Sequence, residues 1–377
     1  MSLLLSIFYF FYFSIIGVYV IFIPKVLSSV PYSASEIGII LGAAPLVRFV
    51  LPFLFMKGFQ LNTRNFHFAL LLMFFSAIAF YLSLYSFYAL LLSNVMLGVG
   101  MSLILPYIEV ISLEHLGKER YGKVRLFGSI GFVLVALLLV KILTSPSIAL
   151  DFLVILTALS ALTAFVIELQ SSKQKSTAHI ENHNKIELLK DYRLWLGLIL
   201  MQVSFGAFYN FFTIYETDNG ISMDMTIYLW SFGVLVEILM LYFQGIFLKN
   251  NLLVILQITT FATAIRWFLV FEYPENLPIL FFSQSIHALS FALFHSAAIS
   301  YLFHLYSNKP LAQQYFSGFT YGLGGVCGAL LSGYIYEWYP EYLFLTASLI
   351  ALFAFISLNL WSKELQKREQ LAENELF

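Results

Sequence analysis

Long apolar runs, separated by short polar segments, follow one another along the whole chain. Each holds about 20 apolar residues, the length that an α-helix needs to cross the hydrocarbon core of a bilayer. The runs lie at residues 3–27, 34–56, 66–86, 88–113, 122–144, 148–169, 193–217, 223–248, 252–272, 277–305, 311–336 and 340–362. An isolated strand cannot satisfy its backbone in lipid, so each run predicts a transmembrane helix. We therefore expect an all-α integral membrane protein with twelve transmembrane helices.

The longest polar stretch falls in the middle of this pattern and divides the spans into six and six. It predicts an N-terminal half over 1–169, a cytoplasmic linker over 170–192, a C-terminal half over 193–362 and a cytoplasmic tail over 363–377. A solvated linker is the better interpretation of the polar stretch, although it contains His179 and His183 four residues apart. A metal site would need a third ligand, and none is evident, so we expect no metal and no cofactor.

The two halves repeat each other weakly. Residues 14–48 align without gaps on residues 203–237, which places Gly17 on Gly206 and Arg48 on Glu237. Two six-helix halves in parallel repeat are the architecture of major facilitator transporters, which bind their substrate between the halves near the midplane of the bilayer. The repeat therefore predicts a pseudo-two-fold fold of this kind.

Composition and charge agree with a membrane protein. The chain is 60% hydrophobic, too apolar for a water-soluble domain of 377 residues. Its net charge of −1 gives no basic face for nucleic acid. Cys327 is the single cysteine, so no intramolecular disulfide exists. No P-loop motif is present, which excludes ATP as a driving force within this chain.

The distribution of lysine and arginine predicts the orientation. If both termini lie in the cytoplasm, sixteen of the twenty basic residues fall on the cytoplasmic side of the spans. Cytoplasmic loops of membrane proteins carry such an excess of positive charge. We expect a multi-pass protein of the inner (cytoplasmic) membrane with both termini inside.

Ionisable residues inside the spans are the candidates for function, because they are costly in lipid and usually face a cavity or a partner. They are Arg48, Glu109, Arg125, Glu237, Arg266, His287 and His295. Structural alternatives exist for several of them. Arg125 would be an inner-leaflet anchor, Glu109 a structural partner of an arginine, and Glu237 with Arg266 a static ion pair. A single histidine such as His295 is usually a packing residue.

Several segments resemble the lactose permease branch of the major facilitator superfamily, and more closely the related phenylpropionate-permease-like proteins. They are FYFFYFSIIGVYVIFIP in span 1, SEIGIILGAAPLVRFVLPFLF in span 2, and PYIEV followed by YGKVRLFGSIGF in spans 4 and 5. The resemblance implies that Glu109 and Arg125 hold the substrate, and that Glu237, Arg266 and His287 carry proton coupling.

The sequence departs from the lactose branch at defined positions. Ser290 replaces the second acid of span 10, and Phe132 replaces the tryptophan that stacks on galactose in that branch. The loop KGFQLNTRNFH lacks the aspartate of the usual signature between spans 2 and 3. Arg48 is similar to the phenylpropionate-permease-like branch. Galactoside specificity is therefore not expected.

These observations favour a proton-coupled symporter of a small organic solute. Arg48 favours a carboxylate, because a guanidinium binds a carboxylate through two hydrogen bonds. Tyr19 and Phe132 suit an aromatic ring, and Glu237 is the expected proton carrier. A nucleoside or a sugar is an alternative substrate, and an efflux antiporter or an uncoupled facilitator is an alternative mode. A membrane-embedded enzyme or a sensor is less favoured. We expect a monomer whose partners are substrate, protons and lipid.

Overall fold

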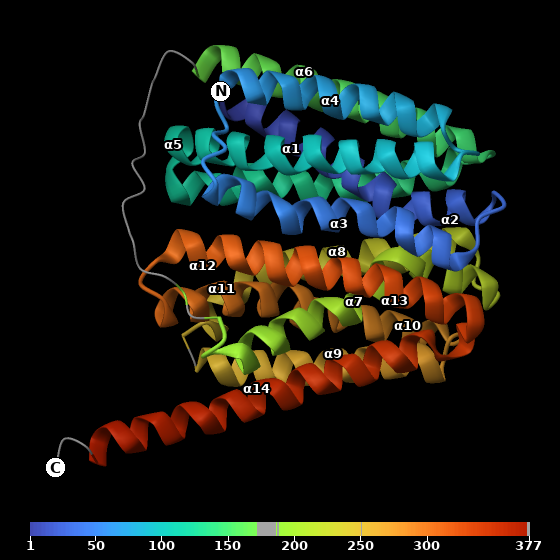
Figure 1. Cartoon of the computed structure of the whole chain (residues 1–377). Helices are drawn as coiled ribbons and strands as arrows, with labels where there is room; N and C mark the ends of the chain where they lie inside the picture. Colours follow the sequence, from blue (N-terminus) through green and yellow to red (C-terminus); the bar gives the residue numbers. More distant parts are fainter. Residues whose placement is uncertain (172–185, 187, 250, 375–377) are drawn as a thin grey trace.

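A bundle of long, roughly parallel and antiparallel helices makes up the protein (Figure 1). The computed structural model describes residues 1–171, 186, 188–249 and 251–374, and it contains no strand among them. The elements in the first part of the chain are α1 (Ser2–Gly17), η1 (Val18–Phe22), α2 (Ile23–Ser28), α3 (Ala34–Met56), α4 (Thr63–Leu82), α5 (Phe87–Ile142) and α6 (Pro146–Ser171). Those in the second part are α7 (Tyr192–Asp218), α8 (Met223–Phe247), α9 (Leu252–Glu272), α10 (Leu277–Ser285), η2 (Ala288–Leu293), α11 (Phe294–Leu305), α12 (Lys309–Tyr315), η3 (Phe316–Leu323), α13 (Gly324–Trp338), η4 (Pro340–Tyr342) and α14 (Leu343–Asn374).

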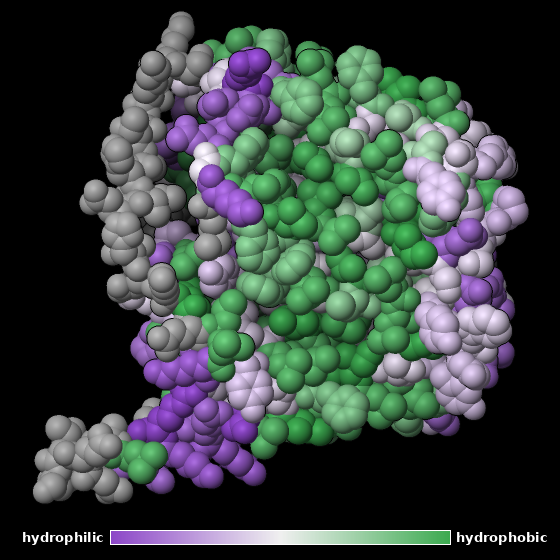
Figure 2. Space-filling view, viewed as in Figure 1, coloured by the Kyte–Doolittle hydropathy of each residue, from purple (hydrophilic) through white to green (hydrophobic). Residues whose placement is uncertain are grey.

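The bundle has the surface of a membrane protein. Figure 2 shows a broad apolar band across the middle of the molecule, with polar residues gathered at its two ends. Eleven helical segments of the described chain are long and apolar enough to span a bilayer. The predicted span 311–336 corresponds to the helical run of α12, η3 and α13, whose many glycine, serine and tyrosine residues make it less apolar. The protein is therefore an all-α, multi-pass membrane protein.

Polar residues just outside the apolar runs determine where several spans begin. Ser33 accepts a hydrogen bond from the backbone of Glu36, and the Glu36 side chain accepts one from the backbone of Ser33, which forms a capping box at the start of α3. Asn62 caps α4 and Asn251 caps α9 in the simpler way, through the side-chain oxygen alone. The short loops of the sequence thus supply the hydrogen bonds that the first turns of these helices lack.

Five of the predicted spans differ in detail from regular, separate helices. The fourth and fifth are assigned as one element, α5, which bends at Gly117 with φ of 67°. A left-handed φ is costly for any residue with a side chain, so glycine is required at this turn. Spans 1, 10 and 11 each contain a π-helical segment, η1, η2 and η3. Such segments are rare and occur often at functional sites.

The helices form two groups. Those up to α6 fill the upper part of Figure 1, and those from α7 onwards fill the lower part. The groups meet where α3 contacts α13 and η3, and where α5 contacts α8. α14 continues without a break to Asn374, past the expected end of the membrane domain at residue 362. The numerical boundaries of the two halves stay predictions, and most of the linker lies outside the described residues.

Glycine allows the two groups to approach closely along α3 and span 11. A side-chain carbon at Gly38 would lie 2.6 Å from the carbonyl oxygen of Ala329, and one at Gly322 would lie 2.6 Å from the backbone of Phe49. Within the first group, a carbon at Gly131 would lie 2.2 Å from the carbonyl oxygen of Phe10. A residue with a side chain at any of these three positions would force the helices apart.

The two ends of the bundle differ in how the groups are joined. Polar contacts between described residues connect the groups at the end opposite the two termini (Figure 1). Lys25 Nζ is 3.3 Å from Asp218 Oδ1, Lys141 Nζ is 3.1 Å from Asp224 Oδ2, and the Ser35 amide donates to Glu337 at 2.8 Å. At the end that carries the termini, the ion pairs of Arg193 and Arg368 stay within the second group. These polar contacts therefore hold the two groups together at the end opposite the termini.

Candidate functional site

Glu109 and Arg125 form an ion pair across the turn inside α5. Each lies eight residues from Gly117, one on either side, so the two arms of the hairpin bring them face to face. Glu109 Oε1 is 3.3 Å from Arg125 Nε, and the two side chains keep 30% and 35% of their surface exposed. The structure thus pairs the two residues with each other, and their role in holding substrate stays a prediction. Their exposure leaves oxygen and guanidinium edges free for a ligand.

Aromatic residues hold this pair in place. The Arg125 guanidinium lies 4.4 Å from the centre of the Phe13 ring and 5.7 Å from that of Tyr9, within the range of a cation–π contact. The Tyr121 hydroxyl donates to Glu109 Oε1 at 3.1 Å. Tyr9 in turn donates to Ser112 at 3.0 Å. Arg125 is thus oriented by the first span and by Glu109 at the same time.

The two predicted aromatic contacts have different surroundings. The Tyr19 hydroxyl lies 3.0 Å from Oδ1 and 2.7 Å from Nδ2 of the fully buried Asn94, whose Nδ2 also donates to the Ile40 carbonyl. This network ties three spans together, so the hydroxyl of Tyr19 is already engaged. Phe132 lies seven residues after Arg125, about 10 Å further along the same face of the helix, and its side chain is half-buried. A substrate role for either ring stays a prediction.

A second cluster is centred on Arg266, which is completely buried in the second group. Its guanidinium donates from Nη1 to His287 Nδ1 at 2.8 Å and to Ser290 Oγ at 3.1 Å, and from Nη2 to Gln284 Oε1 at 2.8 Å. It also stacks on Phe208 at 4.5 Å and on Trp267 at 4.2 Å. Ser290, which stands where the lactose branch has an acid, therefore accepts a hydrogen bond but adds no negative charge.

His287 separates Arg266 from Glu237, so the direct ion pair considered from the sequence is not formed. His287 Nε2 is 3.4 Å from Glu237 Oε2. A guanidinium can only donate, so Nδ1 of His287 must accept and carries no hydrogen. The hydrogen of the neutral ring then lies on Nε2 and points at the Glu237 carboxylate. If His287 were protonated on both nitrogens, its Nδ1–H would face the N–H donor of Arg266, and the hydrogen bond between them would be lost.

Arg48 is the one ionisable residue of the predicted site for which the described chain provides no hydrogen bond or ion pair. It lies on α3 and its side chain is exposed. It also lies close enough for its charge to act on Tyr12 in the first group and on Tyr209 and Tyr321 in the second. Arg48 is therefore an unpaired cation at the junction of the two groups, although α3 is otherwise packed on span 11.

The two clusters lie on helices that meet at the boundary between the groups. Arg125 lies on α5 and Glu237 on α8, and these two helices contact each other. Arg48 lies on α3, which contacts η3 of the second group. Ionisable residues predicted from the sequence therefore lie on helices on both sides of this boundary.

The structure gives a partner to one further candidate and adds residues that the sequence analysis does not name. For His295 the sequence favours a packing role, but its Nδ1 lies 2.6 Å from the hydroxyl of Tyr321. Gln284 and Tyr121 each bind a charged site residue. Glu216 on α7 is fully buried, and neither of its carboxylate oxygens has a hydrogen-bond partner among the described residues. An intramembrane acid is a signal that sequence inspection could have used, whereas hydroxyl and amide partners carry no such signal.

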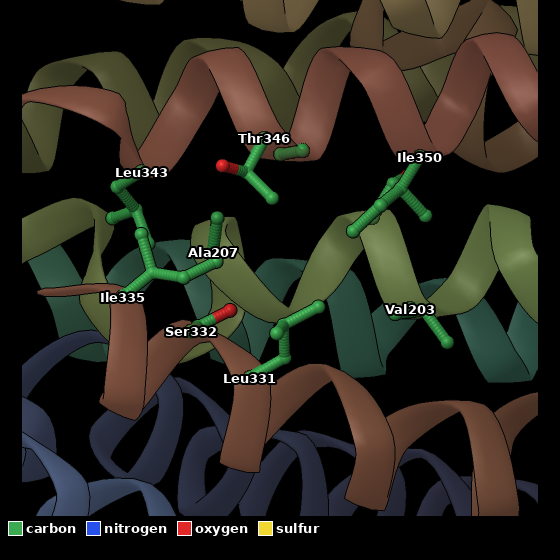
Figure 3. Close-up of a pocket in the computed structure, with 10 residues that line it drawn as sticks. Val203, Ala207, Leu331, Ser332, Ile335, Leu343, Thr346 and Ile350 are labelled. Atoms are coloured by element: carbon green, nitrogen blue, oxygen red, sulfur yellow. The ribbon is translucent and has the colours of Figure 1, made fainter. Parts of the chain in front are cut away.

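Two other sites considered have no part in this region. A small void between α7, α13 and α14 is lined by Ser204, Ser332, Thr346 and apolar side chains, and its volume of about 10 Å³ holds one water molecule at most (Figure 3). His179 and His183 lie outside the described residues. In the rest of the chain, no three histidine, cysteine or acidic side chains are grouped so as to hold a metal ion.

Two packed groups of membrane-spanning helices around a shared polar interior define a membrane transport protein of the major facilitator type. The chain belongs to the MFS_1 like family, whose profile matches residues 2–347. The expected resemblance, fold class and assignment as a transporter rather than an enzyme are confirmed by this match and by the related proteins.

Relatives and solved structures agree with this assignment. A probable 3-phenylpropionic acid transporter of Escherichia coli (strain K12) is 26% identical over 363 residues, which cover 91% of this chain and 93% of that protein. The structure of the nucleoside transporter NupG superposes with a TM-score of 0.80 at 17% identity, over 96% of this chain and 99% of that one. A D-xylose–proton symporter gives a TM-score of 0.68 at 12% identity, over 95% and 96% of the two chains. The structural likenesses show the fold.

Proposed function

We propose that the protein is a proton-coupled symporter of a small aromatic carboxylate, of the 3-phenylpropionate type, that works by alternating access. The observation that carries the proposal is the state of charge of the site. Glu109 balances Arg125, and Glu237 balances Arg266 through His287, whereas Arg48 has no counter-charge among the described residues. An unpaired cation within a membrane span is costly, and a carboxylate substrate would supply the missing counter-charge.

The same arrangement couples the substrate to a proton. A substrate anion at Arg48 lowers the positive potential in the interior, which makes proton binding at Glu237 more favourable. By thermodynamic reciprocity, a proton on Glu237 strengthens binding of the anion to the same extent. Carboxylate and proton would therefore travel together, and Ser290 leaves Glu237 as the acid that carries the proton.

Alternating access is supported by the asymmetry of the two ends. The polar contacts Lys25–Asp218 and Lys141–Asp224 close the end opposite the termini, while Glu109 and Arg125 keep a third of their surface exposed. We propose that the protein is a monomer in the inner membrane with both termini in the cytoplasm. In that orientation the closed end faces outward, and the structure corresponds to an inward-facing state. Rocking of the two groups about α3 and span 11 would open the end opposite the termini and close the end that carries the termini.

Uptake into proteoliposomes tests the proposal. We expect purified protein to accumulate radiolabelled 3-phenylpropionate when the lumen is made alkaline, and to lose the accumulated label on addition of a protonophore. Uridine and D-xylose should not be taken up. Equilibration without accumulation would indicate an uncoupled facilitator, and export in exchange for inward-moving protons would indicate an antiporter. Uptake of uridine alone would contradict an organic acid as substrate.

Arg48→Gln should weaken binding of the acid selectively. A hydrogen bond to a charged group contributes about 1.5–3 kcal/mol, so the Kd for 3-phenylpropionate should rise roughly 10–100-fold. The Kd for the neutral 3-phenylpropanamide should change less than about 3-fold, because the amide places no charge at Arg48. Both Kd values are measured by calorimetry in detergent. Arg64→Gln, at an exposed arginine outside the site, is the matched control. Equal losses for acid and amide would contradict a carboxylate at Arg48.

A further inference from the structure

Three rings on span 10 are stacked in a column. Phe291 lies parallel to His287, with an angle of 2° between the rings and 5.4 Å between their centres, and it stacks on His295 with 24° and 6.4 Å. The three residues are four apart in the chain. Residues with this spacing drift around a regular α-helix of 3.6 residues per turn, but the π-helical segment η2 lies between them and has more residues per turn. The π segment thus keeps the rings on one line.

The two ends of the column are in different surroundings. His287 ends in the Arg266–Glu237 cluster, where both of its nitrogens are engaged. His295 is half-buried and bonds through Nδ1 to the Tyr321 hydroxyl at 2.6 Å, and its Nε2 has no hydrogen-bond partner among the residues that the structure describes. Tyr321 lies in η3, the π segment of span 11. His295 lies at the start of α11, directly after the π segment η2.

Packing between the two groups places Arg48 near the pair. Arg48 lies on α3 and Tyr321 lies in η3, and these two elements contact each other. A side-chain carbon at Gly318, three residues before Tyr321, would lie 3.9 Å from the carbonyl oxygen of Arg48. The immediate neighbours of the pair are aromatic, since Phe316 lies 5.6 Å from His295 and 5.5 Å from Tyr321, measured between ring centres. The pair is thus a polar site beside an aromatic ring, next to the helix that carries Arg48.

We infer that His295 and Tyr321 form a subsite that hydrogen-bonds a polar substituent on the aromatic ring of the substrate, while Arg48 holds its carboxylate. This inference rests on the proposed function and makes it more specific. When Tyr321 donates to Nδ1, Nε2 of His295 carries the hydrogen and donates to the substituent oxygen; in the opposite tautomer, Nε2 accepts. A ring hydroxyl satisfies either tautomer. The preferred substrates are therefore hydroxylated aromatic acids.

Binding of two acids that differ by one hydroxyl tests the subsite. Calorimetry compares 3-(3-hydroxyphenyl)propionate with unsubstituted 3-phenylpropionate. We expect wild-type protein to bind the hydroxylated acid about 10-fold more tightly, as one hydrogen bond would give. His295→Phe keeps a ring stacked on Phe291 but removes both nitrogens, so this preference should fall to about 1. The Kd for the unsubstituted acid should stay within about 2-fold.

Conservative variants separate a substrate contact from a structural role. His295→Gln can place an amide near the position of Nε2, so it should restore part of the preference. Tyr321→Phe should reduce the preference without abolishing it, because it removes only the group that orients the imidazole. His304→Gln, at the cytoplasm-facing end of the same helix by the proposed topology, is the control and should leave the preference unchanged.

The outcomes that contradict the subsite are distinct from those that contradict the proposed function. If wild-type protein binds neither acid, the proposed function fails and the subsite fails with it. If it binds 3-phenylpropionate but shows no preference for the hydroxylated acid, only the subsite is overturned. The subsite is also overturned if His295→Phe weakens both acids equally or lowers the melting temperature so far that 3-phenylpropionate binding is lost, since the histidine is then structural.

Discussion

Arg125→Lys is expected to abolish measurable substrate binding, with a rise in Kd of about 100-fold or more, while the protein still inserts and folds. The guanidinium contacts Glu109 through Nε, lies over the Phe13 ring and still presents its remaining nitrogens to a ligand. An ammonium keeps the charge but has neither the planar face nor the fork that these contacts use together. Calorimetric titration of 3-phenylpropionate, beside a thermal melt, measures the effect.

Lys123 provides the matched control for this experiment. It lies two residues away on the same arm of α5 and is exposed, so Lys123→Arg should bind like wild type. If Arg125→Lys inserts normally and binds substrate as tightly as wild type, Arg125 is a topological anchor at the inner leaflet. That was the alternative interpretation of this residue from the sequence, and the contact with Glu109 would then be a structural ion pair.

The fold was largely accessible from the sequence because lipid imposes a simple rule. A segment that crosses a bilayer must be apolar, long and helical, so hydropathy alone marks the spans. The same rule does not predict irregularities inside a span. The π segments η1, η2 and η3 lie in runs that read as ordinary apolar helix. They arise from packing between helices, which a hydropathy pattern does not describe.

The charged residues of the candidate site could be predicted from the sequence, but the contacts between them could not. Arg48, Glu109, Glu237 and Arg266 are visible in the sequence because an ionisable group in lipid is costly. The position of His287 between Arg266 and Glu237 depends on how spans 8, 9 and 10 pack, so it required the structure. Neutral partners such as Gln284 and Tyr321 are common in helices and carry no sequence signal of their own.

Glu237→Gln is expected to uncouple transport from the proton gradient while sparing substrate exchange. The glutamine oxygen can still accept from His287 Nε2, so the contact at 3.4 Å and the stack beneath it are preserved. A glutamine cannot release a proton, so the variant stays in the equivalent of the protonated state throughout the cycle. In proteoliposomes, counterflow of labelled 3-phenylpropionate should remain within about 3-fold of wild type, a difference of less than 1 kcal/mol.

Accumulation against a concentration gradient is where this variant should fail. With an alkaline lumen, the internal concentration of substrate should rise only to the external one, because no group remains that gains a proton outside and loses it inside. Glu114→Gln, at an exposed acid near the turn of α5, should accumulate substrate like wild type. If Glu237→Gln also does, another acid carries the proton, and the buried, unpartnered carboxyl of Glu216 becomes the next group to replace. Loss of counterflow and accumulation together would instead show that Glu237 is needed for substrate binding or for the conformational change itself.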